Sequence, residues 1–141
     1  MAEFREHYEG FRAINVDIAG ISVDEPGHSE PMRELYRLPF PILCDTDAAI
    51  VKSWGLFNSA EKGGIAQSAV FLIKPGLRVK YCSIDTTTSR IRAAELLEYI
   101  RLTLTGVEAK PPERRSIVPT VGEVARSVLP TMKESLFGKK R

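Results

Sequence analysis

The sequence predicts an α/β domain: helices flank a largely parallel sheet, and the sheet ends in a β-hairpin followed by a closing helix. Three observations predict this class. β-branched apolar runs alternate with segments of helical periodicity, a Pro-Gly pair separates two later apolar runs, and the composition is 43% hydrophobic and 27% charged, as in ordinary globular domains. We expect one domain over residues 1–105, a linker over 106–119, and an amphipathic helix with a basic tail over 120–141.

The beginning of the chain predicts a helix followed by a strand. Phe4, Tyr8 and Phe11 recur at helical spacing over residues 2–11. No Ser, Thr, Asp or Asn precedes this pattern as a helix cap, so we expect the chain to be cut from something longer. The apolar, β-branched run over residues 14–23 then predicts a buried strand.

The middle of the chain predicts a helix, a short strand and a second helix. The first helix is expected to begin at Ser29 or Glu30, just before a proline. Residues 42–44 form a short extended run, and Asp45 or Asp47 can cap the helix that follows.

The second half of the chain predicts a β-hairpin and a last helix. Residues 69–73 and 78–84 are the two strands, and Pro75 and Gly76 fit the central positions of a type II turn. The hydroxyls of residues 86–89 can cap the helix, whose expected apolar face consists of Ile91, Ala94, Leu97, Ile100 and Leu104. A hairpin and helix in this order are the second half of a thioredoxin fold.

Charge and cysteine content exclude several classes of protein. The formal net charge of +2 is spread evenly, so we expect no nucleic-acid partner, and no apolar run is long enough to predict a transmembrane segment. The charged start is unlike a secretory signal, which favours a cytoplasmic location. Cys44 and Cys82 show no CxxC spacing, and His7 and His28 have no partner at metal-ligand spacing. We therefore expect no metal and no other cofactor.

Three segments, in this order and spacing, resemble the alkyl hydroperoxide reductase / thiol-specific antioxidant family, which comprises peroxiredoxins and their redoxin relatives. They are residues 18–24, residues 38–45 followed by 49–55, and residues 65–73 with the Pro-Gly turn. The resemblance implies a thioredoxin-like, peroxiredoxin-type fold. It also implies a thiol oxidoreductase that reduces hydroperoxides and takes electrons from a thioredoxin- or glutaredoxin-like thiol. A homo-oligomer is one assembly that the resemblance allows.

The same resemblance places the peroxidatic cysteine just before Met1, so we expect that cysteine, its loop and the first core strand to be missing from this chain. The chemistry needs a cysteine at a helix N-terminus near a cation, because both lower the thiol pKa and favour the thiolate that attacks a peroxide. The family commonly places an arginine where this sequence has Ser68, beside Gln67. Both residues are expected on the active-site face, where neutral side chains activate a thiol less well.

The missing strand would lie between the strands expected at residues 14–23 and 69–73. Two open edges would leave backbone groups unpaired, at roughly 1–3 kcal/mol per buried group. We therefore expect the chain to be unstable, to aggregate, or to complete its sheet from a partner.

Two readings of the cysteines and of the function stay open. Cys44 follows an extended segment and precedes a helix start, so it is a candidate resolving or substitute redox cysteine, or else a small buried residue; Cys82, within a hairpin strand, is the weaker candidate. The alternative to the enzyme is a non-catalytic thioredoxin-fold module that binds a partner through the tail helix. A cysteine upstream of Met1 would favour the enzyme, and thiol-independent binding would favour the module.

Overall fold

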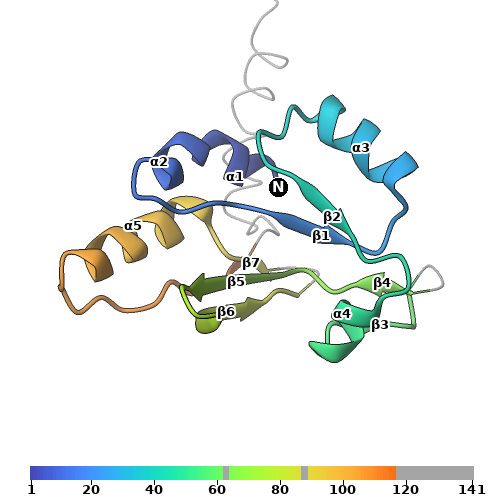
Figure 1. The fold of residues 1–141 in the computed structure, drawn as a ribbon. Helices are drawn as coiled ribbons and strands as arrows, with labels where there is room; N and C mark the ends of the chain where they lie inside the picture. The colour runs from blue at the N-terminus through green and yellow to red at the C-terminus, as the bar shows by residue number, and fades with distance from the viewer. Residues whose placement is uncertain (62–63, 87–88, 117–141) are drawn as a thin grey trace, which may run out of the picture.

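The computed structural model describes residues 1–61, 64–86 and 89–116. Helices and strands alternate along this part of the chain, and Figure 1 labels them. In chain order they are α1 (Ala2–Glu6), α2 (Tyr8–Arg12), β1 (Gly20–Ser22), α3 (Pro26–Leu35), β2 (Ile42–Cys44), α4 (Ala49–Ser53), β3 (Phe57–Asn58), β4 (Ile65–Ala66), β5 (Ala69–Lys74), β6 (Arg78–Ile84), β7 (Ser89–Arg90), α5 (Ala93–Leu104) and β8 (Arg115–Ser116).

Four pairs of strands make up the β structure. β1 and β2 are parallel, with Ile21 opposite Leu43, whereas β5 and β6 form an antiparallel hairpin with Phe71 opposite Cys82. β3 pairs with β4, and β7 pairs with β8, both antiparallel. Among the described residues, β1 pairs only with β2 and β5 pairs only with β6. Strands β1 and β5 run in opposite directions in Figure 1. One edge of each strand therefore remains open to a further strand.

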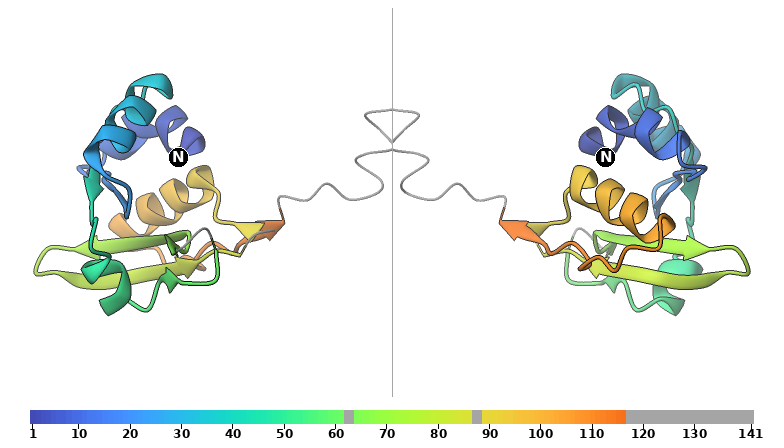
Figure 2. Two further views of the ribbon diagram at one scale, coloured as in Figure 1. Left: turned by 90° about the vertical axis from the view of Figure 1, so that its right-hand side faces the viewer. Right: turned by 90° about the vertical axis from the view of Figure 1, so that its left-hand side faces the viewer.

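The hydrophobic core is built around α5. Its buried members are Phe11 from α2 and Ala93, Leu96, Leu97, Tyr99 and Ile100 from α5. Partly buried side chains pack against this cluster from the segment ahead of β1, with Val16 and Ile18, and from β5, with Val70 and Leu72. Figure 2 shows α5 lying over the β5–β6 hairpin. Helix α5 thus joins the β5–β6 hairpin to the segment that leads into β1.

Several elements of the first half differ from the sequence prediction. The helix expected over residues 2–11 is divided at His7, whose φ of −102° and ψ of 6° leave the helical region. The strand expected over residues 14–23 is reduced to β1, because its first part packs on the core without a strand partner. Helix α3 begins at Pro26 rather than at Ser29 or Glu30. Proline suits the first helical position, because the N–H that it lacks would have no partner within the helix there.

The predicted caps of α4 are confirmed. Asp45 accepts hydrogen bonds from the amides of Val51 at 2.8 Å and Ile50 at 3.2 Å, and Asp47 accepts one from Ala49 at 3.2 Å. These bonds, that of Val51 first, lower the pKa of Asp45.

The hairpin turn is also confirmed at its glycine. Gly76 has a φ of 82°, which a residue with a Cβ adopts only with strain.

The last helix starts later than predicted and turns a different face to the core. Helix α5 starts at Ala93 with Arg92 as its N-cap residue, and Ser89 and Arg90 lie in β7. Ala94 is exposed and Leu104 is 64% exposed, whereas Leu96 and Tyr99 are buried. Ile91, Leu97 and Ile100 are buried as predicted.

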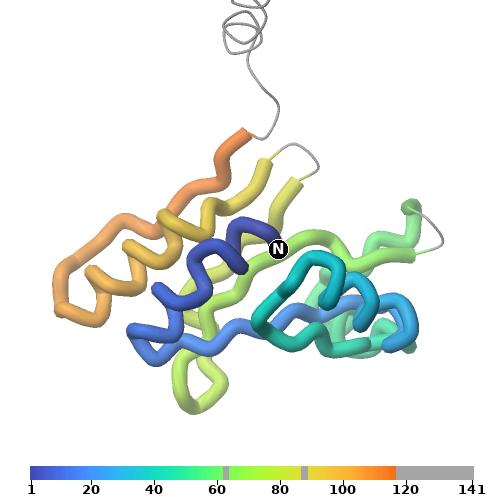
Figure 3. Tube along the Cα trace, turned by 90° about the horizontal axis from the view of Figure 1, so that it is seen from above, coloured from blue at the N-terminus to red at the C-terminus, as the bar shows by residue number. Residues whose placement is uncertain are grey.

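The chain after α5 turns back along that helix, as the orange trace in Figure 3 shows. The helix predicted over residues 120–141 lies outside the described residues. In the described part of the chain, no helix combines the length and the apolar character needed to cross a membrane.

Candidate functional site

Gln67 and Ser68, the residues expected on the active-site face, lie in the link between β4 and β5. Both are tied to Asp85, the residue that follows β6. The Ser68 hydroxyl donates to Oδ2 of Asp85 at 3.2 Å, and Gln67 Nε2 donates to the Asp85 carbonyl at 3.3 Å. The amide of Asp85 donates in return to the Ser68 carbonyl at 2.8 Å. The start of one hairpin strand is therefore fastened to the end of the other.

Asp85 is the centre of this site, and its side chain is only 2% exposed. Its Oδ1 accepts a hydrogen bond from the Ser83 hydroxyl at 3.2 Å, and its Oδ2 lies 3.9 Å from Nε of Arg90. A buried carboxylate needs such partners, because an uncompensated charge is strongly unfavourable away from water. We call Gln67, Ser68, Ser83, Asp85 and Arg90 the Asp85 cluster.

Arg90 brings the positive charge of the cluster, and it does so from β7. Its side chain is 38% exposed, so part of the guanidinium faces solvent beside Asp85. The guanidinium also donates to the Thr86 and Ser89 carbonyls. A cation thus stands at the face where the sequence shows only the neutral Gln67 and Ser68.

Sequence reasoning missed Ser83, Asp85 and Arg90, because they lie at or beyond the end of the hairpin and have no local spacing to Ser68. One feature of the sequence could have pointed to two of these residues. Ser83 and Asp85 are two residues apart at the end of a strand, so their side chains leave the strand on one side.

Neither cysteine belongs to the Asp85 cluster, although Cys82 directly precedes Ser83 in β6. Cys44 is the half-buried last residue of β2, and Cys82 is exposed within β6; both are free thiols. Helix α4 begins five residues after Cys44, and its first amides already donate to Asp45. The carboxylate of Asp45 therefore takes the donors that could have stabilised a thiolate at Cys44.

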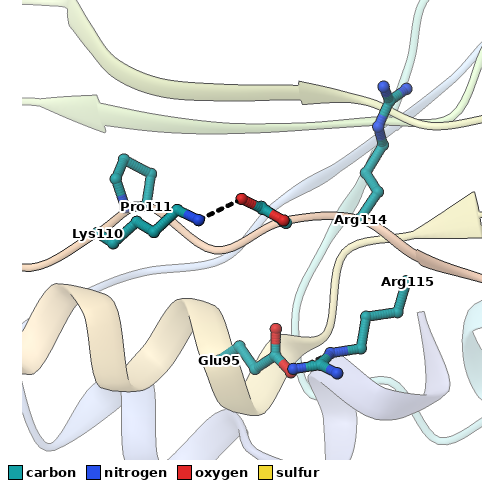
Figure 4. Close-up of a pocket in the computed structure, with 6 residues that line it drawn as sticks. Glu95, Lys110, Pro111, Arg114 and Arg115 are labelled. Atoms are coloured by element: carbon teal, nitrogen blue, oxygen red, sulfur yellow. Dashed lines mark hydrogen bonds and ion pairs between the residues drawn. The ribbon is translucent and has the colours of Figure 1, made fainter.

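Other charged groups of the described region do not form a metal site. Among the described residues, no three His, Cys, Asp or Glu side chains lie close enough to hold a metal ion. A polar pocket lies beside α5, where Figure 4 shows Lys110 and Arg115 directed at acidic partners. Lys110 pairs with Glu113 at 2.6 Å and Arg115 pairs with Glu95 at 2.6 Å, so these charges satisfy one another.

The fold is that of solved peroxiredoxins. The structure is similar to reduced Prx3 of Vibrio vulnificus in complex with H2O2, with a TM-score of 0.65 and 20% identity over 73% of this chain and 67% of that one. It is also similar to AhpC of Mycobacterium bovis, with a TM-score of 0.66 and 20% identity over 77% of this chain and 61% of that one. The architecture is therefore a peroxiredoxin-type thioredoxin fold.

Sequence comparison points the same way. The chain is 31% identical to peroxiredoxin 2 of Thermoplasma acidophilum over 84 residues, which cover 55% of this chain and 41% of the relative. It is 40% identical to the chloroplastic peroxiredoxin Q of Populus jackii over 53 residues, covering 38% of this chain and 25% of the relative. The matched region thus spans half or less of these curated relatives. The model of the AhpC/TSA family matches residues 1–82, and the chain accordingly belongs to the AhpC/TSA family.

Proposed function

We propose that this chain forms the sheet, hairpin and closing helix of a thiol peroxidase that reduces hydroperoxides. The observation that carries the proposal is the match of the AhpC/TSA family model over residues 1–82. The Asp85 cluster supports it, because it sets a cation and hydrogen-bond donors at the face formed by Gln67 and Ser68.

The reaction proposed is a two-electron reduction. A cysteine thiolate attacks one peroxide oxygen, the O–O bond breaks, the sulfur becomes a sulfenic acid, and the other oxygen leaves as an alcohol or water after taking up a proton. Two thiol groups of a reductant then return the sulfenic acid to the thiol, with release of water and formation of a disulfide. A thioredoxin- or glutaredoxin-like protein is the class of reductant that fits.

The attacking sulfur in this proposal belongs to neither Cys44 nor Cys82. Cys82 lies in the middle of β6, opposite Phe71, and not at the start of a helix. Cys44 precedes a helix whose first amides are already bound by Asp45. The family resemblance instead places the nucleophile ahead of α1, and Arg90 would be the cation of the described chain that stands at the active-site face.

The test is to isolate the protein from its host, determine its intact mass and N-terminal sequence, and assay hydroperoxide reduction with a thiol reductant. We expect a cysteine ahead of the present Met1, activity that its replacement by serine abolishes, and activity that survives both Cys44→Ser and Cys82→Ser. Loss of activity on Cys44→Ser alone would identify Cys44 as the nucleophile instead. A host protein that starts at Met1 and reduces no hydroperoxide would refute the proposal.

A second candidate function is a partner-binding module without catalysis, and the open edges of β1 and β5 favour it. An extended segment of another chain could add to either edge by main-chain hydrogen bonds. Such binding would persist when Cys44 and Cys82 are both replaced by serine, and this persistence separates it from any thiol-dependent interaction.

A further inference from the structure

The segment after α5 is held against the body of the domain although its composition is that of a solvated linker. We call residues 107–116 the strap. It begins after Gly106, whose φ of 79° reverses the chain at the end of α5. It then runs back beside α5 and ends as β8. The strap therefore starts at one end of α5 and finishes near the other, where β7 precedes that helix.

The first fastening of the strap is at its middle. The Tyr81 hydroxyl on β6 donates to the Pro112 carbonyl at 2.8 Å, and Ala109 packs against the hydrophobic core. The Tyr81 ring is itself fixed, since it lies 5.9 Å from the ring of Tyr99 on α5. This contact joins the hairpin, the closing helix and the strap at one point.

The second fastening is at the end of the strap. Arg115 pairs with Glu95 of α5 at 2.6 Å, and the guanidinium of Arg114 donates to the Ile84 carbonyl at the end of β6. In β8 the same Arg115 stands opposite Arg90 of β7. The strap thus forms the strand partner of the residue that supplies the charge of the Asp85 cluster.

This backbone pairing contributes to the position of Arg90. Its contact with Asp85 is a 3.9 Å ion pair with a side chain that is partly in water, and such a contact alone restrains a long side chain weakly. Its other hydrogen bonds go to the carbonyls of Thr86 and Ser89, in its own loop, so they move with it. The pairing of β7 with β8 adds a backbone contact to this segment, which is flanked by the buried Asp85 and Ile91.

We propose that the strap is a latch that positions Arg90 beside Asp85, with Tyr81 and Glu95 as the two positioning residues that keep it closed. The catalytic meaning of this latch rests on the proposed function. When the strap detaches, β7 loses its strand partner and the guanidinium leaves the active-site face. The C-terminal part of the chain then controls the charge of a site built by the hairpin.

The first test measures the latch without any activity. Hydrogen exchange of residues 85–92 is followed by mass spectrometry in Tyr81→Phe and Glu95→Gln, with Tyr36→Phe and Glu113→Gln as matched controls. Tyr36 is an exposed tyrosine at the C-cap of α3, and Glu113 forms its ion pair with Lys110, within the strap. We expect exchange of 85–92 to be roughly twofold to tenfold faster in the first two variants, as for loss of one hydrogen bond, and unchanged in the controls.

The latch is overturned if exchange of residues 85–92 is unchanged in Tyr81→Phe and Glu95→Gln, or if Glu113→Gln accelerates it equally. The second test uses the active host protein and its pH profile. Tyr81→Phe is expected to raise the apparent pKa of the reacting thiol, because the cation moves away, whereas Tyr36→Phe leaves it unchanged. Faster exchange with an unaltered pH profile would overturn the catalytic role of the latch, and absence of peroxidase activity would instead overturn the proposed function alone.

Discussion

Ser68 and Asp85 lie seventeen positions apart in the chain and are joined twice, by the Ser68 hydroxyl to Oδ2 of Asp85 at 3.2 Å and by the Asp85 amide to the Ser68 carbonyl at 2.8 Å. This double contact closes the open end of the β5–β6 hairpin. It also sets a buried carboxylate beneath the face at which we propose that the peroxide reacts.

Replacement of Asp85 by alanine is expected to destabilise the domain. The hydroxyls of Ser68 and Ser83 would lose their acceptor and Arg90 its counter-ion, and a buried polar group without a partner costs roughly 1–3 kcal/mol. Urea unfolding would measure the change. Asp17→Asn is the control, because that side chain is 83% exposed. Equal stability of the two variants would contradict a structural role for Asp85.

Gly10 marks the close approach of α2 to α5. A Cβ at this position would lie 2.6 Å from Cδ2 of Leu97, so Gly10→Ala is expected to cost about 1–3 kcal/mol through overpacking, despite the better helix propensity of alanine. Leu97→Ala alone is expected to cost about 2–5 kcal/mol. In the double variant the alanine at position 10 should no longer be unfavourable. Strict additivity in a double-mutant cycle would show that the two residues do not interfere.

Deprotonation of the Tyr81 hydroxyl is expected to lower the stability of the domain at alkaline pH. Burial, with smaller contributions from Asp85 and Cys82, raises the pKa of Tyr81 above its ordinary value of 10.0. A raised pKa means that the folded state holds the proton more tightly, so the stabilisation is complete below about pH 10 and is lost as the pH rises through the folded-state value. Unfolding of the parent and of Tyr81→Phe, compared at pH 8 and above pH 10, would measure this. The stability difference between them should shrink at the higher pH, and a difference independent of pH would argue against it.

The open edges of β1 and β5 predict concentration-dependent association of the chain. Each strand bonds on one side only among the described residues, and paired edges are more stable than solvated or buried unpaired ones. Light scattering coupled to size-exclusion chromatography should show a mass that rises with concentration. A monomer with a sharp, concentration-independent thermal transition would contradict this expectation.

The two thiols should react at different rates in the native protein. Cys82 is exposed on β6, whereas Cys44 is half-buried at the end of β2 next to the Asp45 carboxylate. Iodoacetamide should therefore modify Cys82 first, as peptide mass mapping would show, and the two rates should converge in denaturant. Faster modification of Cys44 would reveal an activated thiolate there and would revive it as a redox cysteine.

The alternation of elements, the hairpin and the caps of α4 could be predicted from the sequence because each depends on neighbouring residues. Gly76 permits the positive φ of its turn, and Asp45 and Asp47 lie within reach of the amides they cap. The start of α3 and the buried face of α5 were predicted less well. Helix α3 was expected to begin just before Pro31 but begins at Pro26. The packing of α5 on the hairpin and on the segment ahead of β1 buries Leu96 and Tyr99 instead of Ala94 and Leu104.

The candidate site was only half accessible to sequence reasoning. Gln67 and Ser68 could be selected by resemblance, but their partner Asp85 and the cation Arg90 join them only when the hairpin closes. The order of helices and strands could be predicted because local periodicity and turn residues encode it, and three segments carried the resemblance to the family. The tertiary structure alone decided which charge stands beside Ser68 and what holds it there, because the hairpin and the strap bring together residues that no local spacing relates.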